Sequence, residues 1–549
     1  MSAFTDAVTA AAASGRGITT GEPKHPVRRE WSVIHTDALA GAARLVEAGL
    51  QVGDAVAILA GDPADVAPAA QAIWLAGGSV TMLHQPTART DVGRYAHETQ
   101  TVLGVIGARF VLLGEPFAEF VEMFDGTPIR GLVIADLIAS GPGSAPPAVS
   151  LPLVPEEGPA LLQLTSGSTS TPKAVQITHR NLWASITGMA EAADLRGGRD
   201  VMVSWLPLFH DMGMVGFLTL PMCLGIEVVK VTPVDFLSNP LLWVELISRH
   251  RGTCTAAPNF AYAITARVMA RADPGLDLSS MRFALNGAEP IDVTAVQAFI
   301  QACAPFGLSP NAMVPAYGMA EATLGVSFHP WGTPVKIDVI DAEQLENQRL
   351  AVQVDPEKSG STRAFPLLGP PVPGIEVAVR DGDGVVRGDR EVGVLFLRGE
   401  PVTDLYLTVD GPRPTRDPDG WLDTGDLGYL VDGEVVVCGR VKDVIIMGGR
   451  NIYPTDIERV AESVSGVRAG NAAAVRWSVD GRRESFAIAV ESRAAADPDE
   501  AARIAADIRA VVTKEIGARP AAVTVLPVGT LPKTPSGKLR RQATAKLIT

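Results

Sequence analysis

The stretch VGDAVAILAG (52–61), ADVAPAAQAIWLAGG (64–78) and SVTMLH (79–84) decides the fold class. A short apolar run, a helix-like segment and a second apolar run follow one another, which is the pattern of a strand–helix–strand unit. The same alternation recurs along the chain through Gly307. It predicts an α/β fold in which helices cover layers of mostly parallel strands.

Composition sets wide bounds on function. The 549 residues exceed what one compact core usually holds, so we expect at least two domains. The net charge of −14 gives no electrostatic reason to bind nucleic acid or an anionic membrane surface. The start, MSAFTDAVTAAAASGRG, lacks the pattern of a signal peptide, and the most apolar stretch (215–229) is too short and interrupted to span a bilayer. We therefore expect a cytoplasmic protein with no transmembrane segment and no nucleic-acid partner.

From about Gly374 the sequence pattern changes from alternating strand-like and helix-like segments to short β-type runs. GIEVAVRDGDGVVRG (374–388) and EVGVLFLRGE (391–400) are β-type runs with turn residues between them, which predicts a β-rich subdomain over about 370–438. Two further β-type runs, VVVC (435–438) and VIIM (444–447), flank a charged segment.

A helical pattern follows in PTDIERVAESVSGV (454–467), with Thr455 or Asp456 as the expected N-cap. The chain beyond the charged segment has about the size of a small α+β domain. We therefore predict a large N-terminal domain of layered α/β subdomains over 1–438, a boundary at 439–443, and a small α+β domain over 444–549.

The strongest local signal is LLQLTSGSTSTPKAVQITHRNL (161–182). Its central part, TSGSTSTPK (165–173), is predicted to join an apolar strand to a helix-like segment. Such a loop can offer backbone N–H groups, hydroxyls and Lys173 to phosphate oxygens. It does not fit GxxxxGK[ST], so it is not a Walker-type phosphate loop. An ordinary Ser/Thr-rich surface loop is the alternative.

TSGSTxxPK resembles the phosphate loop of the adenylate-forming superfamily, which includes acyl-CoA synthetases, peptide-synthetase adenylation domains and luciferases. Five further segments match that superfamily in order: NGAEP (286–290), YGMAE (317–321), TGD (424–426), GRVKD (439–443) and PKTPSGK (532–538). The resemblance covers essentially the whole chain. It implies ATP and Mg²⁺ as cofactors and a mobile C-terminal domain. Ser170 and Ala174 depart from it, because many members have glycine there.

The resemblance also implies roles for particular residues, and each role has a simpler alternative. Tyr317 can stack on adenine, or be a core aromatic. Glu321 can give Mg²⁺ a carboxylate oxygen, or lie on the surface. Asp426 can accept hydrogen bonds from the ribose, or be a turn residue. Lys538 can meet the charge that develops at the α-phosphate, or be one of several solvated basic residues near the C-terminus.

The predicted nucleotide-binding residues are Thr165, Ser166, Gly167, Ser168, Thr169, Lys173, Asn286, Gly287, Ala288, Glu289, Tyr317, Gly318, Met319, Asp426 and Arg440. Glu321 is the predicted metal ligand, and Lys442 marks the hinge about which the C-terminal domain of this superfamily rotates.

The segment WLPLFHDMGMVGF (205–217) points to one branch of the superfamily. Its HDMG (210–213), together with TAAPNFAY (255–262), resembles the fatty-acyl-AMP ligases, in which this region lines the junction of the acyl and nucleotide sites. We therefore predict His210 as a catalytic residue beside Lys538 and Glu321; a core histidine is the alternative. No convincing counterpart exists of the aspartate by which peptide synthetases bind an amino group.

The stretch between Glu321 and LGPP (368–371) is longer than acyl-CoA ligases of this superfamily use. The surplus, around 335–365, resembles the insertion of the acyl-AMP ligases, which packs against the C-terminal domain and disfavours turnover with CoA. An ordinary surface excursion is the alternative.

Together these features predict activation of a fatty acid to acyl-AMP with release of pyrophosphate. The acyl group then passes to the phosphopantetheine thiol of an acyl carrier protein, or of a carrier domain in a polyketide or peptide synthase. Such a carrier is expected to be acidic, and Lys533, Lys538, Arg540 and Arg541 are candidates to guide its docking. The alternatives are an acyl-CoA synthetase and a noncatalytic relative that binds a nucleotide or an acyl group.

Overall fold

The computed structural model of the chain divides into two compact units. It describes residues 2–86, 90–139, 150–165, 172–357, 360–447, 450–479, 483–534 and 537–548. Unit 1 comprises 1–335, 368–376 and 397–422, and unit 2 comprises 336–367, 377–396 and 423–549. The predicted boundary at 439–443 lies inside unit 2 and stays a prediction, as do the predicted domain limits.

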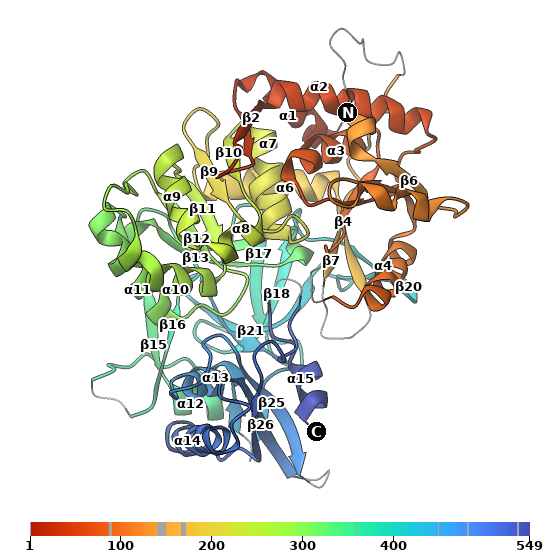
Figure 1. Ribbon diagram of the computed structural model, residues 1–549. Helices are drawn as coiled ribbons and strands as arrows, with labels where there is room; N and C mark the ends of the chain where they lie inside the picture. The colour runs from red at the N-terminus through yellow and green to blue at the C-terminus, as the bar shows by residue number, and fades with distance from the viewer. Residues whose placement is uncertain are drawn as a thin grey trace. The chain divides into compact units, whose positions relative to one another are not determined.

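The first eight-stranded sheet of unit 1 has a parallel centre and antiparallel edges. Its order is β14 (Gly325–Phe328), β13 (Met313–Gly318), β12 (Phe283–Asn286), β11 (Cys254–Ala257), β9 (Val201–Ser204), β10 (Glu227–Lys230), β1 (Gly17–Thr20) and β2 (Val27–Glu30). Helices α9 (Leu241–His250), α10 (Asn259–Val268) and α11 (Val293–Cys303) flank strands β11 to β13 (Figure 1).

The second sheet of unit 1 contains the segment that decided the fold class. Its order is β20 (Gly411–Pro414), β19 (Leu405–Thr408), β8 (Lys173–Thr178), β7 (Pro159–Thr165), β4 (Ser79–Met82), β3 (Ala55–Leu59), β5 (Ala108–Leu113) and β6 (Arg130–Val133). Strands β7, β4, β3, β5 and β6 run parallel. Helix α3 (Pro63–Leu75) connects β3 to β4, which confirms the predicted strand–helix–strand unit.

The connection after β7 differs from the prediction. Lys173 begins a strand, β8, which pairs antiparallel with both β7 and β19, and helix α6 (His179–Ala192) starts only after it. The reason is local. The run AVQI after Lys173 suits a strand, whereas Thr178 and Asn181 form a capping box that sets the start of α6. The segment 165–173 therefore joins two strands, so the N-terminus of a helix does not follow it directly.

The remaining α-helices of unit 1, and one π-helix, lie around these sheets. They are α1 (Ala3–Ala11), α2 (Trp31–Glu47), α4 (Val92–Ile106), α5 (Ile134–Ile138), the π-helix η3 (Met212–Thr219), α7 (Leu220–Leu224) and α8 (Pro233–Ser238). No helix among the described residues is long and apolar enough to cross a membrane.

Unit 2 contains the β-rich part of the chain and the sequence surplus near 335–365. A four-stranded sheet runs β17 (Ile375–Arg380), β18 (Gly393–Gly399), β21 (Leu422–Val431), β22 (Glu434–Arg440). The start of β17 (375–376), the end of β18 (397–399) and Leu422 are assigned to unit 1. The surplus forms a hairpin of β15 (Ile337–Asp341) and β16 (Thr362–Pro366), with α12 (Ala342–Gln348) between the strands.

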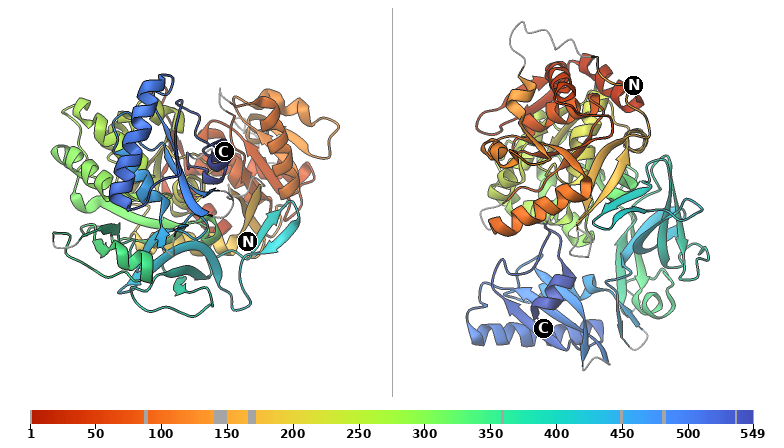
Figure 2. Two further views of the ribbon diagram at one scale, coloured as in Figure 1. Left: turned by 90° about the horizontal axis from the view of Figure 1, so that it is seen from below. Right: turned by 90° about the vertical axis from the view of Figure 1, so that its right-hand side faces the viewer.

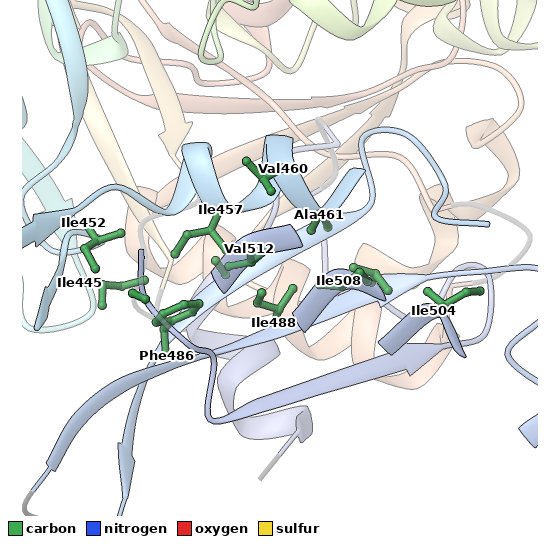
Figure 3. Close-up of a cluster of buried hydrophobic side chains, with 14 residues drawn as sticks. Ile445, Ile452, Ile457, Val460, Ala461, Phe486, Ile488, Ile504, Ile508 and Val512 are labelled. Carbon is green, nitrogen blue, oxygen red and sulfur yellow. The ribbon is translucent and has the colours of Figure 1, made fainter. Parts of the chain in front are cut away.

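The C-terminal part of unit 2 has its own core. A hairpin of β23 (Ile445–Met447) and β24 (Arg450–Ile452) precedes a sheet of β25 (Ala472–Val479), β26 (Arg483–Glu491) and β27 (Ala522–Leu526). Helices α13 (Pro454–Glu462) and α14 (Pro498–Ile516) cover one face of this sheet (Figure 2). Ile457, Ile488, Ile504 and Ile508 meet in the core between them (Figure 3).

Alternation along the strands gives this sheet a second apolar face. Ala473 and Ala489 point away from the core of α13 and α14, and they pack with Leu531, while Leu539 and Ile548 lie against this cluster. The segment around Lys538 and the last helix, α15 (Arg541–Ile548), therefore belong to the opposite face.

The predicted N-cap of α13 was wrong. The cap is Tyr453, which makes no side-chain capping bond, and Pro454 is the first helical residue. Proline suits that position because its missing N–H would have no partner in the helix anyway. The predicted strands on either side of 439–443 are confirmed as β22 and β23.

Candidate active site

A lysine, a glutamate and a tyrosine from three separate segments meet in unit 1. Lys173 begins β8, Glu321 lies in the 3-10 turn η7 (Ala320–Ala322), and Tyr406 lies in β19. Lys173 Nζ is 3.4 Å from Glu321 Oε1, and the Tyr406 hydroxyl donates a 2.7 Å hydrogen bond to the same oxygen. Lys173 Nζ also lies 3.7 Å from the centre of the Tyr406 ring. The fold thus brings two predicted residues together with Tyr406, which no recognised motif indicated.

Backbone hydrogen bonds fix this group. The Thr403 N–H donates to the Glu321 carbonyl oxygen at 2.9 Å, just before β19 begins. Strand β19 pairs with β8 in a register that sets Tyr406 opposite Val175 and therefore diagonal to Lys173. One short segment of chain thus ties the turn of Glu321 to the strand of Lys173.

Several buried side-chain oxygen atoms in unit 1 have no hydrogen-bond partner among the described residues. Two of them are Thr165 Oγ1, at the end of β7, and Asn286 Oδ1, at the end of β12. Both residues lie at carboxyl ends of strands, where α/β folds bind ligands. A buried polar group without a partner is costly, so a ligand that bonds to it gains affinity. A nucleotide fits this pattern, because its phosphates accept from a hydroxyl and its adenine amino group donates to an amide oxygen.

The residues at this site could also hold a metal ion. Glu321 offers the carboxylate oxygens that Mg²⁺ prefers beside phosphates, and Lys173 offers a cation to the phosphates. Four predicted nucleotide-binding residues, Ser166, Gly167, Ser168 and Thr169, lie outside the described residues.

The predicted adenine turn is anchored to helix α10. Asn286 Nδ2 donates to Asn259 Oδ1 at 3.1 Å, and the Glu289 carboxylate accepts from the Phe260 N–H at 2.7 Å, at the start of that helix. Ala288 adopts a left-handed φ of 70°, which is uncommon for a residue with a Cβ. Glu289 therefore holds the turn in place, and its predicted contact with the nucleotide stays a prediction.

Tyr317 and Gly318 end β13 beside this turn. A Cβ at Gly318 would collide with the Leu324 carbonyl group, so only glycine fits there. The Tyr317 hydroxyl donates to the Met319 sulfur at 3.7 Å, and Tyr317 is half-buried. A Cβ at Gly287, on the neighbouring strand end, would lie 3.1 Å from the backbone of β13. The backbones therefore approach closely at this end of the sheet, and the predicted stacking of Tyr317 on adenine stays a prediction.

His210 lies beside a second histidine that no motif indicated. His210 Nδ1 is 2.6 Å from Asp211 Oδ1, and Gln163 Nε2 donates to the Phe209 carbonyl at 2.9 Å, which ties this segment to the strand that leads to Thr165. The His84 ring packs edge-on against Phe209, with 4.8 Å between ring centres. Burial, and after it the charge of His210, lowers the pKa of His84 to about 4, so His84 is neutral near pH 7.

A fully buried lysine, Lys230, contacts the chain just before His210. Lys230 Nζ donates to Ser204 Oγ at 3.0 Å and to the Leu206 carbonyl at 2.5 Å. Burial lowers the pKa of Lys230 to about 7, because the apolar surroundings disfavour the charged ammonium.

This lysine gives a prediction about stability. The unfolded chain keeps the usual lysine pKa of 10.5, so it binds more protons than the folded chain between about pH 7 and 10.5, and the free energy of unfolding rises with pH across that window. Lys230→Met removes the penalty of burying the charge. We expect it to raise the free energy of unfolding at pH 7 by roughly 1–4 kcal/mol and to flatten the rise toward pH 10. Denaturant unfolding at several pH values measures both, with Lys24→Met at an exposed position as control. A lower stability of Lys230→Met would contradict the prediction.

Asp426 and Arg440 face each other in unit 2. They are partners in the register of β21 and β22, and Arg440 Nε lies 2.9 Å from Asp426 Oδ1. The Asp426 N–H donates to Thr424 Oγ1 at 3.0 Å, and Asp426 is buried. Lys442, the predicted hinge residue, is an exposed residue of the turn between β22 and β23. The predicted contact of this pair with a ribose stays a prediction.

Lys538 is exposed on a short loop of unit 2. Its N–H donates to Thr534 Oγ1 at 3.0 Å, and its carbonyl accepts from the Thr534 N–H at 2.8 Å. Lys533 is engaged instead, because its Nζ donates to the Gly470 carbonyl and to Asn471 Oδ1 at 3.0 and 2.8 Å.

Arg541, one of the predicted docking residues, is engaged by acidic side chains within unit 2. Its guanidinium donates to both carboxylate oxygens of Glu458, at 2.8 and 2.7 Å, and to Asp443 Oδ2 at 3.0 Å. Arg541 therefore links α15 to α13 and to the turn of the predicted hinge. The docking hypothesis now rests on Arg540 and Lys538.

Comparison with known proteins identifies the family. The sequence profile described as "AMP-binding enzyme" matches residues 19–407. The chain belongs to this family. As a member it is an adenylate-forming ligase with an α/β fold, and this family uses ATP. The predicted fold class and the resemblance to the fatty-acyl-AMP ligase branch are thereby confirmed.

The chain is similar to several known proteins over most of its length. "Putative ligase Rv1013" of Mycobacterium tuberculosis is 52% identical over 97% of both chains. "Putative acyl-CoA synthetase" of Caulobacter vibrioides is 34% identical over 93% of this chain and 88% of its own, and the medium-chain-fatty-acid–[acyl-carrier-protein] ligase JamA of Moorena producens is 36% identical over 70% and 67%. A solved structure from work on fatty acyl-adenylate ligases of E. coli and L. pneumophila matches with a TM-score of 0.90 and 31% identity, covering 100% of this chain and 98% of that one.

Proposed function

We propose that this adenylate-forming ligase activates a fatty acid as acyl-AMP and passes the acyl group to a carrier protein. The observation that carries the first half is the Lys173–Glu321 pair, one cation for phosphate and one carboxylate for metal, 3.4 Å apart beside the loop 165–173. JamA and the matched acyl-adenylate ligase structure support a fatty acid as the substrate. A cytoplasmic location belongs to the same proposal.

In the proposed reaction the carboxylate of the acid attacks the α-phosphorus of ATP, a P–O bond forms, and pyrophosphate leaves. The protein's own task is positioning and charge neutralisation. Lys173 and Thr165 hold phosphates, Glu321 holds Mg²⁺, and the metal would neutralise phosphate charge when bound. Tyr317 and Asn286 hold the adenine, Asp426 and Arg440 hold the ribose, and Lys538 neutralises the charge that develops at the α-phosphate.

The contacts of His210 suit a role next to the carboxylate. Asp211 engages Nδ1 of the His210 ring, which leaves the other ring nitrogen to meet a substrate carboxylate. We propose it as the residue that orients the substrate carboxylate.

A carrier protein as acceptor is supported by the contacts of the segment 335–365. Glu346 on α12 accepts from Arg450 at 2.7 Å, and Arg363 on β16 pairs with Asp456 at 2.7 Å, so this segment is bonded to the C-terminal part of unit 2. If the segment 335–365 acts as the acyl-AMP ligase insertion does, these ion pairs would let it restrain the C-terminal part of unit 2. An acyl-CoA synthetase is the second candidate, favoured by the name of the Caulobacter relative.

One experiment decides between these outcomes. The purified chain is incubated with ATP, Mg²⁺, a ladder of fatty acids and either CoA or a phosphopantetheinylated acyl carrier protein, and products are identified by mass spectrometry. We expect acyl-AMP and acylated carrier, with little acyl-CoA. Abundant acyl-CoA would replace the proposal by the synthetase alternative, and the absence of acyl-AMP with every acid would contradict the fatty-acid assignment.

A further inference from the structure

Tyr406 makes two different contacts to two oppositely charged groups. Its ring faces the Lys173 ammonium at 3.7 Å, and its hydroxyl donates to Glu321 Oε1 at 2.7 Å. Both charged side chains are mostly buried, with 27% of Lys173 and 11% of Glu321 exposed. A tyrosine at this place therefore acts on both members of the pair.

The direct contact between Lys173 and Glu321 is loose by comparison. Their N–O distance of 3.4 Å exceeds the 2.7–2.9 Å that is typical of a charge-assisted hydrogen bond. Among the described residues the ammonium and the carboxylate contact each other and Tyr406, so without Tyr406 we expect the two charges to approach more closely. Tyr406 instead offers the ammonium an aromatic face and the carboxylate a hydroxyl.

We propose that Tyr406 is a positioning residue for Mg·ATP: its ring presents Lys173 to the phosphates and its hydroxyl presents Glu321 to the metal. This inference rests on the roles proposed above for Lys173 and Glu321. The tyrosine is placed for this task by its strand, since β19 pairs with β8 next to Lys173 and the chain just before it bonds to the Glu321 turn through the Thr403 N–H.

Two variants separate the two contacts. Tyr406→Phe keeps the ring and removes only the hydroxyl, whereas Tyr406→Leu removes both. The full-length protein is titrated with ATP in a calorimeter, with and without Mg²⁺ and without any acid, so that binding is measured apart from turnover. Tyr429→Phe is the matched control, because the Tyr429 hydroxyl also donates to a carboxylate, Asp338 Oδ2, at 2.8 Å in unit 2.

We expect Tyr406→Phe to reduce the gain in ATP affinity that Mg²⁺ brings by roughly threefold to tenfold, and to leave the affinity for ATP alone within about twofold. Tyr406→Leu is expected to weaken ATP binding also without Mg²⁺, by roughly twofold to tenfold, because the cation–π contact is gone. Tyr429→Phe leaves both affinities unchanged.

Three results overturn the inference. Wild-type affinities in both Tyr406 variants would show that neither contact matters. An equal loss with and without Mg²⁺ in Tyr406→Phe would assign the hydroxyl to the fold rather than to the metal. A Tyr406→Leu variant that matches Tyr406→Phe would remove the role of the ring. Should Tyr406→Leu fail to fold, Tyr406→Phe still decides the role of the hydroxyl.

The proposed function fails by a different result. Lys173→Ala and Glu321→Gln with unchanged binding of Mg·ATP would reject the nucleotide site itself. If those two variants bind weakly and the Tyr406 variants bind normally, the site stands and only the inference about Tyr406 is wrong.

Discussion

Replacement of Lys538 by alanine is expected to lower ATP-dependent pyrophosphate release by roughly 100- to 1,000-fold, the usual cost of removing one group that stabilises transition-state charge. The side chain is exposed on its loop, and only its backbone bonds to Thr534, so the fold has no evident need of the ammonium. Binding of ATP should change little, because Lys538 is proposed to act on charge that develops during the reaction. Pyrophosphate release with a fatty acid, and ATP titration without one, measure the two effects.

The control for this prediction is Lys514→Ala, which removes another exposed lysine of unit 2, in the last turn of α14. It should behave like the wild type. Transfer from purified acyl-AMP to the carrier should fall far less in Lys538→Ala, because charge neutralisation belongs to the first half-reaction and the proposed docking role is shared with Arg540. Unchanged pyrophosphate release in Lys538→Ala would reject the role of Lys538 in charge neutralisation. Lys538 would then be a solvated surface lysine with no part in catalysis.

The site residues that could be predicted are those that belong to short, contiguous sequence motifs. Lys173 follows its Ser/Thr loop directly, and Glu321 lies four residues after Tyr317 at the end of one strand, so short motifs were enough to find them. The strand–helix–strand fold followed from local hydrophobic alternation in the same way.

What could not be predicted depends on distant partners. Tyr406 reaches Glu321 only because β19 pairs with β8, and the local sequence LYLT (405–408) does not predict that pairing. Arg541 looked like a solvated basic residue near the C-terminus, yet it binds Glu458, which lies on another helix. The segment predicted as a helix after Lys173 forms a strand instead, which pairs with β7 just before it and with the distant β19.

Glu346→Ala is expected to destabilise unit 2 by about 1–3 kcal/mol, since it removes the buried carboxylate that Arg363 and Arg450 share while Arg363 keeps Asp456 as a partner. Glu346 Oε1 lies 2.8 Å from Arg363, and Glu346 Oε2 accepts from Arg450 at 2.7 Å, with Glu346 and Arg363 both buried. The Arg363 guanidinium also stacks on the Tyr453 ring at 4.6 Å. Thermal unfolding, together with hydrogen exchange of α12 and β24, would detect the loss.

The same change tests whether this anchoring restricts the acceptor. If the segment 335–365 restrains the C-terminal part of unit 2, loosening it should raise acyl-CoA formation by on the order of tenfold, while acyl-AMP formation at a temperature below unfolding stays near the wild-type rate. The matched control is Arg387→Ala, which breaks an ion pair of 2.7 Å with Asp381 at a more exposed position and should cost at most about 1 kcal/mol. A destabilised Glu346→Ala protein that still makes no acyl-CoA would show that these ion pairs support the fold only. The acceptor would then be set elsewhere, and the resemblance of this segment to the acyl-AMP ligase insertion would lose its functional meaning.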